Sequence, residues 1–406
     1  MKKLKTVILL IASITCSLFF LSTNINADDT LWNYYIGESI QEVKISNDGN
    51  TIILFDASGT LTVLDQFGNL KWTNKFTQSR YNVPNIGSIA ISSDGTTIAT
   101  SCLQEHEYGR IETKCFDQNG ETLWSNSYYG NLELSRIRSS LSLSSDGQLL
   151  TFIGMVEDNR SGFLYHRNGT EIWLDDQKIP TEIKISGNGK FILIEENSGF
   201  WEPSRYGRLH YLSKEKTVQW SEEYDIHYTS SSISFDGFTI ATTLEDGQLY
   251  VLNQRGDKIF SYSANPATQL VVDVSADGSS IALGSNENQV IFFNRNGSTL
   301  WNYETTSAVQ SVSLSENGSS LAAGCENGMV YLLSKEGNLL WSYKTPNSAK
   351  VSISNDGNNL AIGSEDKNVY FIPEFPSFTI LAIMCTISLL MTFYKKRITS
   401  RRNNIS

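Results

Sequence analysis

The sequence has few of the residues from which catalytic and metal sites are usually built. Its 406 residues include four histidines, His106, His166, His210 and His227, which are scattered, and no C-x-x-C pair. It also lacks G-x-S-x-G, H-E-x-x-H and a Walker-type glycine loop, and no histidine stands close in sequence to a candidate nucleophile. The sequence therefore predicts no catalytic, cofactor or metal site, and we expect a protein that is not an enzyme.

Cysteine is scarce as well. Five are present, but Cys16 and Cys385 lie in terminal apolar segments, which leaves Cys102, Cys115 and Cys325 in the body of the chain. An odd number excludes a complete disulfide framework. Cys102 and Cys115 fall on opposite arms of one predicted hairpin, so that pair could form in an oxidising exterior, and pairing with Cys325 stays open.

Positive charge is sparse between the two ends of the chain. The formal net charge is −11, and eight of the 32 basic residues belong to the termini. Without them, 24 basic residues stand against 43 acidic ones, about −19. Such a body repels phosphate backbones, and no stripe of lysine and arginine offsets this repulsion. Nucleic acid is therefore excluded as the expected partner.

Two apolar segments bracket the acidic body. Residues 1–27 resemble a secretory signal peptide, with a basic start, an apolar stretch over 7–21 and Ala27 as a small residue for cleavage. Residues 377–394 contain no charge and are followed by the basic tail 395–406. This pattern predicts a single transmembrane helix with its tail in the cytoplasm, although a buried core helix is the alternative. We expect residues 28–372 to form an ectodomain facing the cell exterior, joined to the membrane by residues 373–376.

A short phrase that repeats eight times determines the expected fold. Asp-Gly or Asn-Gly between β-rich runs favours tight hairpin turns, so each copy marks a turn between two strands. Turn chemistry also explains the acidic residues better than calcium binding does. The copies are Ser46–Gly49, Ser92–Gly95, Ser144–Gly147, Ser186–Gly189, Ser234–Gly237, Ser275–Gly278, Ser315–Gly318 and Ser354–Gly357.

Each repeat reads as four strands, with one large aromatic on the fourth. Four strands per unit at a period of about 40 residues indicate a propeller blade. A row of tryptophans could suggest a sugar-stacking or cofactor site, but strict repetition favours packing between blades. The aromatics are Trp32, Trp72, Trp124, Trp173, Trp220, Phe260, Trp301 and Trp341.

The two ends of the repeat array predict how the ring closes. Trp32 and its strand precede every first strand, and the last unit ends near residue 372 without a fourth strand. The N-terminal strand should therefore complete the last blade and remove an exposed sheet edge. The sequence predicts an all-β, eight-bladed β-propeller closed in this way, with a seven-bladed ring as the alternative.

The repeat phrases resemble a known family. Gly-x-x-Leu-Trp-x-Tyr, Val-x-Ile-Ser-x-Asp-Gly and Ile-Ala-x-Gly-Ser are similar to the PQQ-like, or quinoprotein-like, propeller repeat over residues 30–372, with some likeness to WD repeats. Quinoprotein dehydrogenases also carry an adjacent cysteine pair and a calcium cluster; this chain has no Cys-Cys, so the resemblance implies the scaffold alone. Pro373-Glu374-Phe375-Pro376, the apolar span and the basic end resemble archaeal PEF-type sorting signals, in which a sortase-like enzyme can remove the tail.

Insertions indicate which face of the disc binds a partner. From turn serine to aromatic, four units take 26 residues, whereas units two, three and four take 32, 29 and 34. The extra residues fall at 103–110, 156–162 and 198–207, and two further long connections follow Trp72 and Trp124. Both kinds of connection emerge on one face, which we call the loop face; the hairpin turns emerge on the opposite turn face.

Aromatic and arginine residues in these segments are the candidate binding residues, since such residues dominate protein interfaces. The alternative is that they only pack the longer loops. The candidates are Arg80, Tyr81, His106, Tyr108, Tyr128, Tyr129, Arg160, Trp201, Arg205 and Tyr206, accompanied by Gln78, Gln104, Glu105, Glu107, Glu157 and Phe200.

Three functions remain open from the sequence. The first is a membrane-anchored module at the cell surface that binds or scaffolds a protein or glycan without a cofactor. The second is an enzyme, either a quinone-dependent oxidoreductase or a hydrolase working in the central channel, for which carboxylates or histidines should cluster at the axis. The third is an envelope assembly factor, as likeness to propeller lipoproteins of envelope biogenesis suggests.

Overall fold

A computed structural model of the chain describes residues 32–76, 86–104, 109–130, 140–156, 159–175, 180–198, 206–264 and 269–372. The predicted signal peptide, the linker 373–376, the predicted membrane helix and the basic tail lie outside these residues. The described segments form strands and turns. None of them contains a helix long and apolar enough to cross a membrane.

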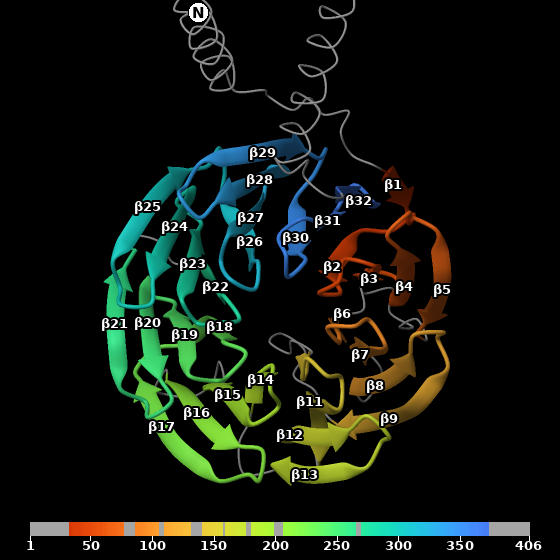
Figure 1. Ribbon diagram of the computed structural model, residues 1–406. Helices are drawn as coiled ribbons and strands as arrows, with labels where there is room; N and C mark the ends of the chain where they lie inside the picture. Colours follow the sequence, from red (N-terminus) through yellow and green to blue (C-terminus); the bar gives the residue numbers. More distant parts are fainter. Residues whose placement is uncertain are drawn as a thin grey trace, which may run out of the picture.

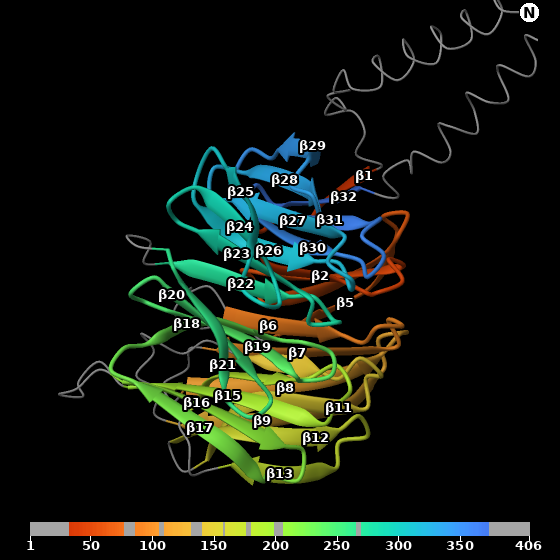
Figure 2. The ribbon, with the colours of Figure 1, turned by 60° about the vertical axis from the view of Figure 1, so that its left-hand side comes forward.

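The described strands form eight four-stranded antiparallel sheets, arranged as a ring around a central axis (Figure 1). Each sheet is one blade, and its first strand lies innermost. The eight-bladed prediction is therefore confirmed and the seven-bladed alternative is wrong. Figure 2 shows the blades stacked around the disc, seen obliquely.

The strand bounds follow the repeat. Blade 1 contains β2 (Ile40–Ile45), β3 (Thr51–Asp56), β4 (Thr60–Asp65) and β5 (Leu70–Lys75); blade 2 contains β6 (Ile86–Ile91), β7 (Thr97–Gln104), β8 (Gly109–Asp117) and β9 (Thr122–Gly130). Blade 3 contains β10 (Leu141–Leu143), β11 (Leu149–Val156), β12 (Asn159–His166) and β13 (Glu171–Asp175); blade 4 contains β14 (Pro180–Ile185), β15 (Phe191–Asn197), β16 (Gly207–Ser213) and β17 (Val218–Tyr224). Blade 5 contains β18 (Tyr228–Ile233), β19 (Thr239–Leu244), β20 (Gln248–Asn253) and β21 (Lys258–Ser263); blade 6 contains β22 (Leu270–Val274), β23 (Ser280–Ser285), β24 (Gln289–Asn294) and β25 (Thr299–Glu304). Blade 7 contains β26 (Val309–Leu314), β27 (Ser320–Cys325), β28 (Met329–Ser334) and β29 (Leu339–Lys344); blade 8 contains β30 (Ala349–Ile353), β31 (Leu360–Ser364), β32 (Asn368–Ile372) and β1 (Trp32–Tyr35).

The N-terminal strand closes the ring, as the sequence predicts. β1 pairs antiparallel with β32, and Trp32 lies opposite Phe371 while Tyr35 lies opposite Asn368. The sheet order β1-β32-β31-β30 makes β1 the outermost strand of blade 8. First and last segments of the described chain thus share one sheet, which satisfies the outer edge of β32.

The repeated serine turn is held by its own side chains. Ser46 Oγ donates to Asp48 Oδ1 at 2.5 Å and accepts the N–H of Thr51 at 3.0 Å. The turn glycine, Gly49, has φ of 74°, a conformation that glycine adopts without a Cβ penalty. Hydrogen bonds from Ser46 and Asn50 lower the pKa of Asp48 despite the opposing effect of partial burial. The carboxylate is already used as an acceptor, which supports turn chemistry as its role.

These turns also join the blades into a continuous ring on the turn face. In each turn a backbone N–H donates to a carbonyl oxygen in the turn of the next blade, at N···O distances of 2.8 to 3.3 Å. The last turn donates back to the first. The donor residues are Asn47, Ser93, Ser145, Asn188, Phe235, Asp277, Glu316 and Asn355.

The repeated aromatics pack between blades, as predicted. Trp301 Nε1 donates to Lys335 O of the next blade at 2.9 Å, and the ring stacks on Phe292 of its own blade with centroids 5.0 Å apart. A Cβ on Gly337 would lie 2.7 Å from the Trp301 ring, so this turn needs glycine. Five other tryptophans donate in the same way, Trp32, Trp72, Trp124, Trp173 and Trp220.

The apolar core lies between neighbouring blades. Second strands such as β3 and β23 are buried along their whole length, whereas outer strands such as β5 alternate between half-buried and exposed. This follows because an inner strand is covered on both faces by adjacent blades.

The three described cysteines are buried, free thiols. Cys102 and Cys115 do lie on paired strands, but Cys102 is opposite Glu112 and Cys115 is opposite Ala99. This register separates the two thiols along the hairpin and excludes a bond between them without backbone movement. Burial raises the pKa of Cys325 to about 11, which keeps it protonated.

Candidate functional site

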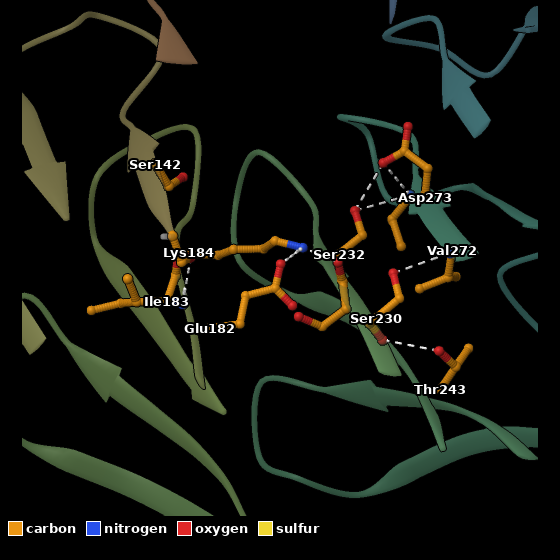
Figure 3. A network of polar contacts seen from close by, with 12 residues as sticks. Ser142, Glu182, Ile183, Lys184, Ser230, Ser232, Thr243, Val272 and Asp273 are labelled. Atoms are coloured by element: carbon orange, nitrogen blue, oxygen red, sulfur yellow. Dashed lines mark hydrogen bonds and ion pairs between the residues drawn. The ribbon is translucent and has the colours of Figure 1, made fainter. Parts of the chain in front are cut away.

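The innermost strands line the central channel, and their side chains satisfy the open edge of the neighbouring blade. The inner edge of each first strand has no partner strand. Ser230 and Ser232 of blade 5 accept the N–H groups of Val272 and Val274 in blade 6 at 3.4 and 3.2 Å (Figure 3). The channel-lining side chains therefore serve mainly to connect neighbouring blades through hydrogen bonds.

The same arrangement recurs at other blade junctions with different residue types. It explains why first strands carry serine and charged residues toward the axis. The acceptor and donor pairs are Ser352 Oγ with Ile45 N, Glu42 Oε2 with Ile89 N, Ser140 Oγ with Ile183 N, Ser142 Oγ with Ile185 N, Asp273 Oδ2 with Leu314 N, Ser311 Oγ with Val351 N and Ser313 Oγ with Ile353 N.

A charged cluster stands out where blades 4 to 6 meet the channel. Lys184 Nζ lies 2.9 Å from Glu182 Oε1, and their side chains are 29% and 30% exposed. Lys184 also donates to the backbone oxygen of Ser231 in blade 5. Glu195, on the second strand, lies directly opposite Glu182 in the β14–β15 register and is 3% exposed. Figure 3 shows Lys184 pointing from blade 4 toward blade 5.

The electrostatics of this cluster are balanced internally. Burial, followed by the Glu182 carboxylate, raises the pKa of Glu195 to about 8, so this carboxyl is protonated at neutral pH. Enclosure alone would lower the pKa of Lys184, but the neighbouring carboxyl groups outweigh it and raise that pKa. The cluster thus consists of a Lys184–Glu182 ion pair beside a neutral acid.

Asp273 is a third acidic group at this channel wall, after Glu182 and Glu195. Its carboxylate accepts hydrogen bonds from Ser232 Oγ and Leu314 N, both at 2.9 Å. Enclosure raises the pKa of Asp273 despite these hydrogen bonds. Within the described residues, no group of three or more His, Cys, Asp or Glu side chains is placed to hold a metal ion. The cluster therefore contains one neutral carboxyl, that of Glu195, and an ion pair whose lysine, Lys184, reaches the next blade.

On the loop face, the insertions of blades 2 and 3 extend the strands. β8 and β9 have nine residues each, and β7, β11 and β12 have eight, against six in β27 and β28. The assignment of residues 103–110 and 156–162 to loops is corrected for the described residues 103–104, 109–110, 156 and 159–162, because all of these belong to paired strands. Gln104 pairs with Arg110, and Val156 with Asn159. Blades 2 and 3 thus project beyond the disc.

Only four of the ten candidate binding residues lie within the described part of the chain. Tyr128 and Tyr129 belong to β9, Arg160 to β12, and Tyr206 directly precedes β16. Arg80, Tyr81, His106, Tyr108, Trp201 and Arg205 lie outside the described residues, as do Gln78, Glu105, Glu107, Glu157 and Phe200. Gln104 belongs to β7, but its side chain is not described.

The four described candidates have different surroundings. Tyr128 packs between blades 2 and 3, with its ring centroid 4.7 Å from that of Phe163, and this contact gives it a packing role. Tyr129 is 60% exposed. Arg160 is partly buried near Glu196, and burial lowers the pKa of its guanidinium. Tyr206 is half-buried.

Two arginines that the sequence did not single out pack on two of these tyrosines, the exposed Tyr129 and the half-buried Tyr206. Arg110 lies over the Tyr129 ring at 5.7 Å, and Arg208 lies over the Tyr206 ring at 4.4 Å. Arg110 pairs with Tyr129 across the β8–β9 register. Such cation–π pairs hold both side chains at the loop-face rim. The β8–β9 register, which the sequence did not reveal, is the information that would have identified Arg110 as the partner of Tyr129.

The structure also brings together a serine, a histidine and a glutamate from the connections of blades 4 and 5. Ser198 Oγ lies 2.9 Å from His227 Nε2, and His227 Nδ1 lies 3.5 Å from Glu245 Oε1. This order resembles a serine hydrolase triad. However, Ser198 and His227 are each 4% exposed, and Ser198 Oγ accepts the N–H of Tyr206. We interpret the chain of contacts as an anchor between the loops of these two blades.

Comparison with known proteins supports the fold and leaves the activity open. A family of unknown function, DUF5711, matches residues 209–367. No curated protein matches the sequence.

Several solved propellers are similar in structure at low identity. BamB from Moraxella catarrhalis has 15% identity and a TM-score of 0.58, and covers 84% of this chain and 98% of its own. The Dos1 propeller has 12% identity and a TM-score of 0.65, with coverage of 85% and 95%. The C-terminal WD40 domain of Sif2 has 12% identity and a TM-score of 0.64, with coverage of 84% and 98%. At these identities the likeness shows that the chain has the architecture of WD40- and BamB-like eight-bladed propellers.

Proposed function

We propose that this protein is a binding or scaffolding module, without catalytic activity, that holds a protein or glycan partner on the loop face of blades 2 to 4. In this proposal residues 1–27 export the chain and residues 377–394 anchor it, so that the propeller faces the cell exterior. The repeat scaffold resembles the quinoprotein-like propeller but serves here without a quinone.

The observation that carries the proposal is the pair of arginine–tyrosine groups at the loop-face rim. Tyr129 is 60% exposed although it projects from an ordered strand. Arg110 is held against it by Ser127 Oγ at 2.9 Å and Glu112 at 3.2 Å. Rigid aromatic and arginine side chains lose little entropy on binding, which makes them effective anchors for a partner.

The channel supports an enzymatic alternative less well. Carboxylates do gather at the axis, as an enzyme would require. However, Glu182 is paired with Lys184, and Asp273 accepts hydrogen bonds from blades 5 and 7. These contacts give Glu182, Lys184 and Asp273 a structural role between blades. An assembly role in the envelope is a special case of the binding proposal, in which the partner is another envelope protein.

A capture experiment with the full chain tests the loop face. Wild-type protein and a Tyr129→Ala, Tyr206→Ala double variant are used to capture partners from solubilised surface membranes. Phe67→Ala is the matched control, because Phe67 is 65% exposed but lies in the β4–β5 turn on the opposite face. All three proteins must first show the same thermal unfolding.

We expect at least a tenfold loss of one specific partner in the double variant and full retention in the control. Equal capture by all three proteins would exclude this site. Protease treatment of intact cells tests the location separately: digestion of residues 28–372 is expected, and full protection would overturn the surface assignment.

A further inference from the structure

A polar hollow lies on the loop face where the ring closes, between β1 of blade 8 and β4 and β5 of blade 1. Its volume is about 380 Å³, within the range of roughly 300–1,000 Å³ that is common for small-molecule sites. Its lining includes two consecutive tyrosines, four serine and threonine hydroxyl groups and both signs of charge. The chief lining side chains are Tyr34, Tyr35, Asp56, Thr60, Thr62 and Thr73.

At this junction, a tyrosine pair that several other junctions have is absent. Where blades 7 and 8 meet, Tyr343 packs on Tyr370 with centroids 5.3 Å apart, and where blades 6 and 7 meet, Tyr303 packs on Tyr331 at 5.4 Å. Tyr331 pairs with the residue that follows the blade aromatic, and Thr62 has the same register position in blade 1. Tyr34 therefore faces a blade that has a threonine at the position where blades 5, 7 and 8 carry a tyrosine.

The hydroxyl groups around this gap are held in place. Asp56 is 3% exposed, and its Oδ1 accepts Ser58 Oγ at 2.7 Å and the N–H of Thr60 at 3.0 Å. Ser58 Oγ lies 2.8 Å from Thr60 Oγ1. Thr62 and Thr73 are paired across β4 and β5. A ligand in the hollow thus meets hydroxyl groups of Ser58 and Thr60 that Asp56 holds in place, together with the Tyr34 side chain.

We propose that this hollow binds one ring of a neutral sugar, a hexose or an N-acetylhexosamine. A sugar ring has an apolar C–H face, which suits a tyrosine ring, and an edge of hydroxyl groups, which suits the hydroxyl groups of Ser58, Thr60 and Thr73. Lys75 balances part of the charge of Glu38 and Asp56 in the lining, which favours a neutral ligand over an anion. The polar wall disfavours an apolar ligand, because its hydroxyl groups would lose their hydrogen bonds to water.

The position of the site has a consequence for ring closure. The sugar contacts the N-terminal strand on one side and blade 1 on the other. A ligand that binds only the closed ring stabilises it, so the unfolding temperature rises with sugar concentration. This site is separate from the arginine–tyrosine pairs of blades 2 and 4, and the inference stands whether or not those pairs bind a partner.

The test uses full-length protein and four probes, glucose, galactose, mannose and N-acetylglucosamine, each titrated up to about 50 mM, since single sugar rings often bind weakly. Saturation-transfer NMR and calorimetry measure binding. Thr62→Tyr fills the hollow with the side chain that blades 7 and 8 carry at this position. Thr122→Tyr places the same side chain at an exposed position of β9 and is the control.

We expect wild type and Thr122→Tyr to bind at least one probe, and Thr62→Tyr to bind it at least tenfold more weakly. If Thr62→Tyr does not fold, Thr73→Val, which removes one exposed hydroxyl, should weaken binding several-fold. Binding of no probe by wild type, or equal binding by the folded hollow variant and wild type, overturns the inference. The Tyr129→Ala, Tyr206→Ala variant should keep its sugar binding, which separates this site from the loop-face proposal.

Discussion

Replacing Glu195 with glutamine should change how stability depends on pH. Glu195 is 3% exposed and lies opposite Glu182 across β14 and β15. In the folded protein its pKa rises from an ordinary 4.5 to about 8, first through burial and then through the Glu182 charge. Between these two pH values the folded chain keeps a proton that the unfolded chain has released. Stability of the wild type therefore falls as the pH rises from about 4.5 to about 8.

The size of the effect follows from the shift. At about 1.4 kcal/mol per pKa unit, a rise of this kind corresponds to a few kcal/mol at the upper end of the window. Glutamine has the shape of the protonated acid and does not titrate, so Glu195→Gln avoids this loss. In a domain of this size about 1 kcal/mol moves Tm by roughly 1–2 °C. We expect Tm of the variant minus Tm of the wild type to grow by several degrees between pH 5 and pH 8.

Thermal unfolding followed by circular dichroism at constant ionic strength measures this difference. Glu304→Gln is the control, because Glu304 is an exposed residue at the end of β25, and its pH profile should run parallel to that of the wild type. Glu182→Gln removes the neighbouring charge and should flatten the profile in part. A Glu195→Gln profile parallel to the wild type from pH 5 to pH 8 would refute the description of Glu195 as a buried neutral acid.

Two further predictions concern the contacts between blades. Gly337→Ala should lower the free energy of unfolding by about 2 kcal/mol, because this residue has φ of 83° and a Cβ would lie 2.7 Å from Trp301. Gly37→Ala, also at positive φ (95°) but with Tyr35 Cε1 4.0 Å from a Cβ, should cost less. Thermal unfolding measures both variants, and equal losses would contradict the packing argument. Phe260→Trp should raise the free energy of unfolding by about 1 kcal/mol, because the indole N–H gains the backbone acceptor that six tryptophans use in the other blades. Phe260→Tyr has no donor at that position and should not raise it. Denaturant unfolding measures both variants, and unchanged or lower stability of the tryptophan variant would count against this contact as a stabilising bond.

The sequence by itself determined the architecture, because its information is local and repeated. A serine, an Asp-Gly or Asn-Gly pair and a following strand form a turn through hydrogen bonds within about five residues, such as those of Ser46. One aromatic per repeat predicted inter-blade packing, and the unpaired strand at Trp32 predicted closure by β1. The length of the insertions identified the blades that project. It did not reveal that the extra residues pair as strands.

Only the tertiary structure decided how residues from different blades meet. Glu182 and Glu195 became neighbours through strand register, and Lys184 reached Ser231 because blade 5 lies beside blade 4. Tyr128 looked like a loop residue but packs on Phe163, since β9 continues through it. Thr62 is unremarkable in sequence. It lines the hollow beside Tyr34 because ring closure places β1, as the outer strand of blade 8, next to blade 1, and no local pattern encodes that arrangement.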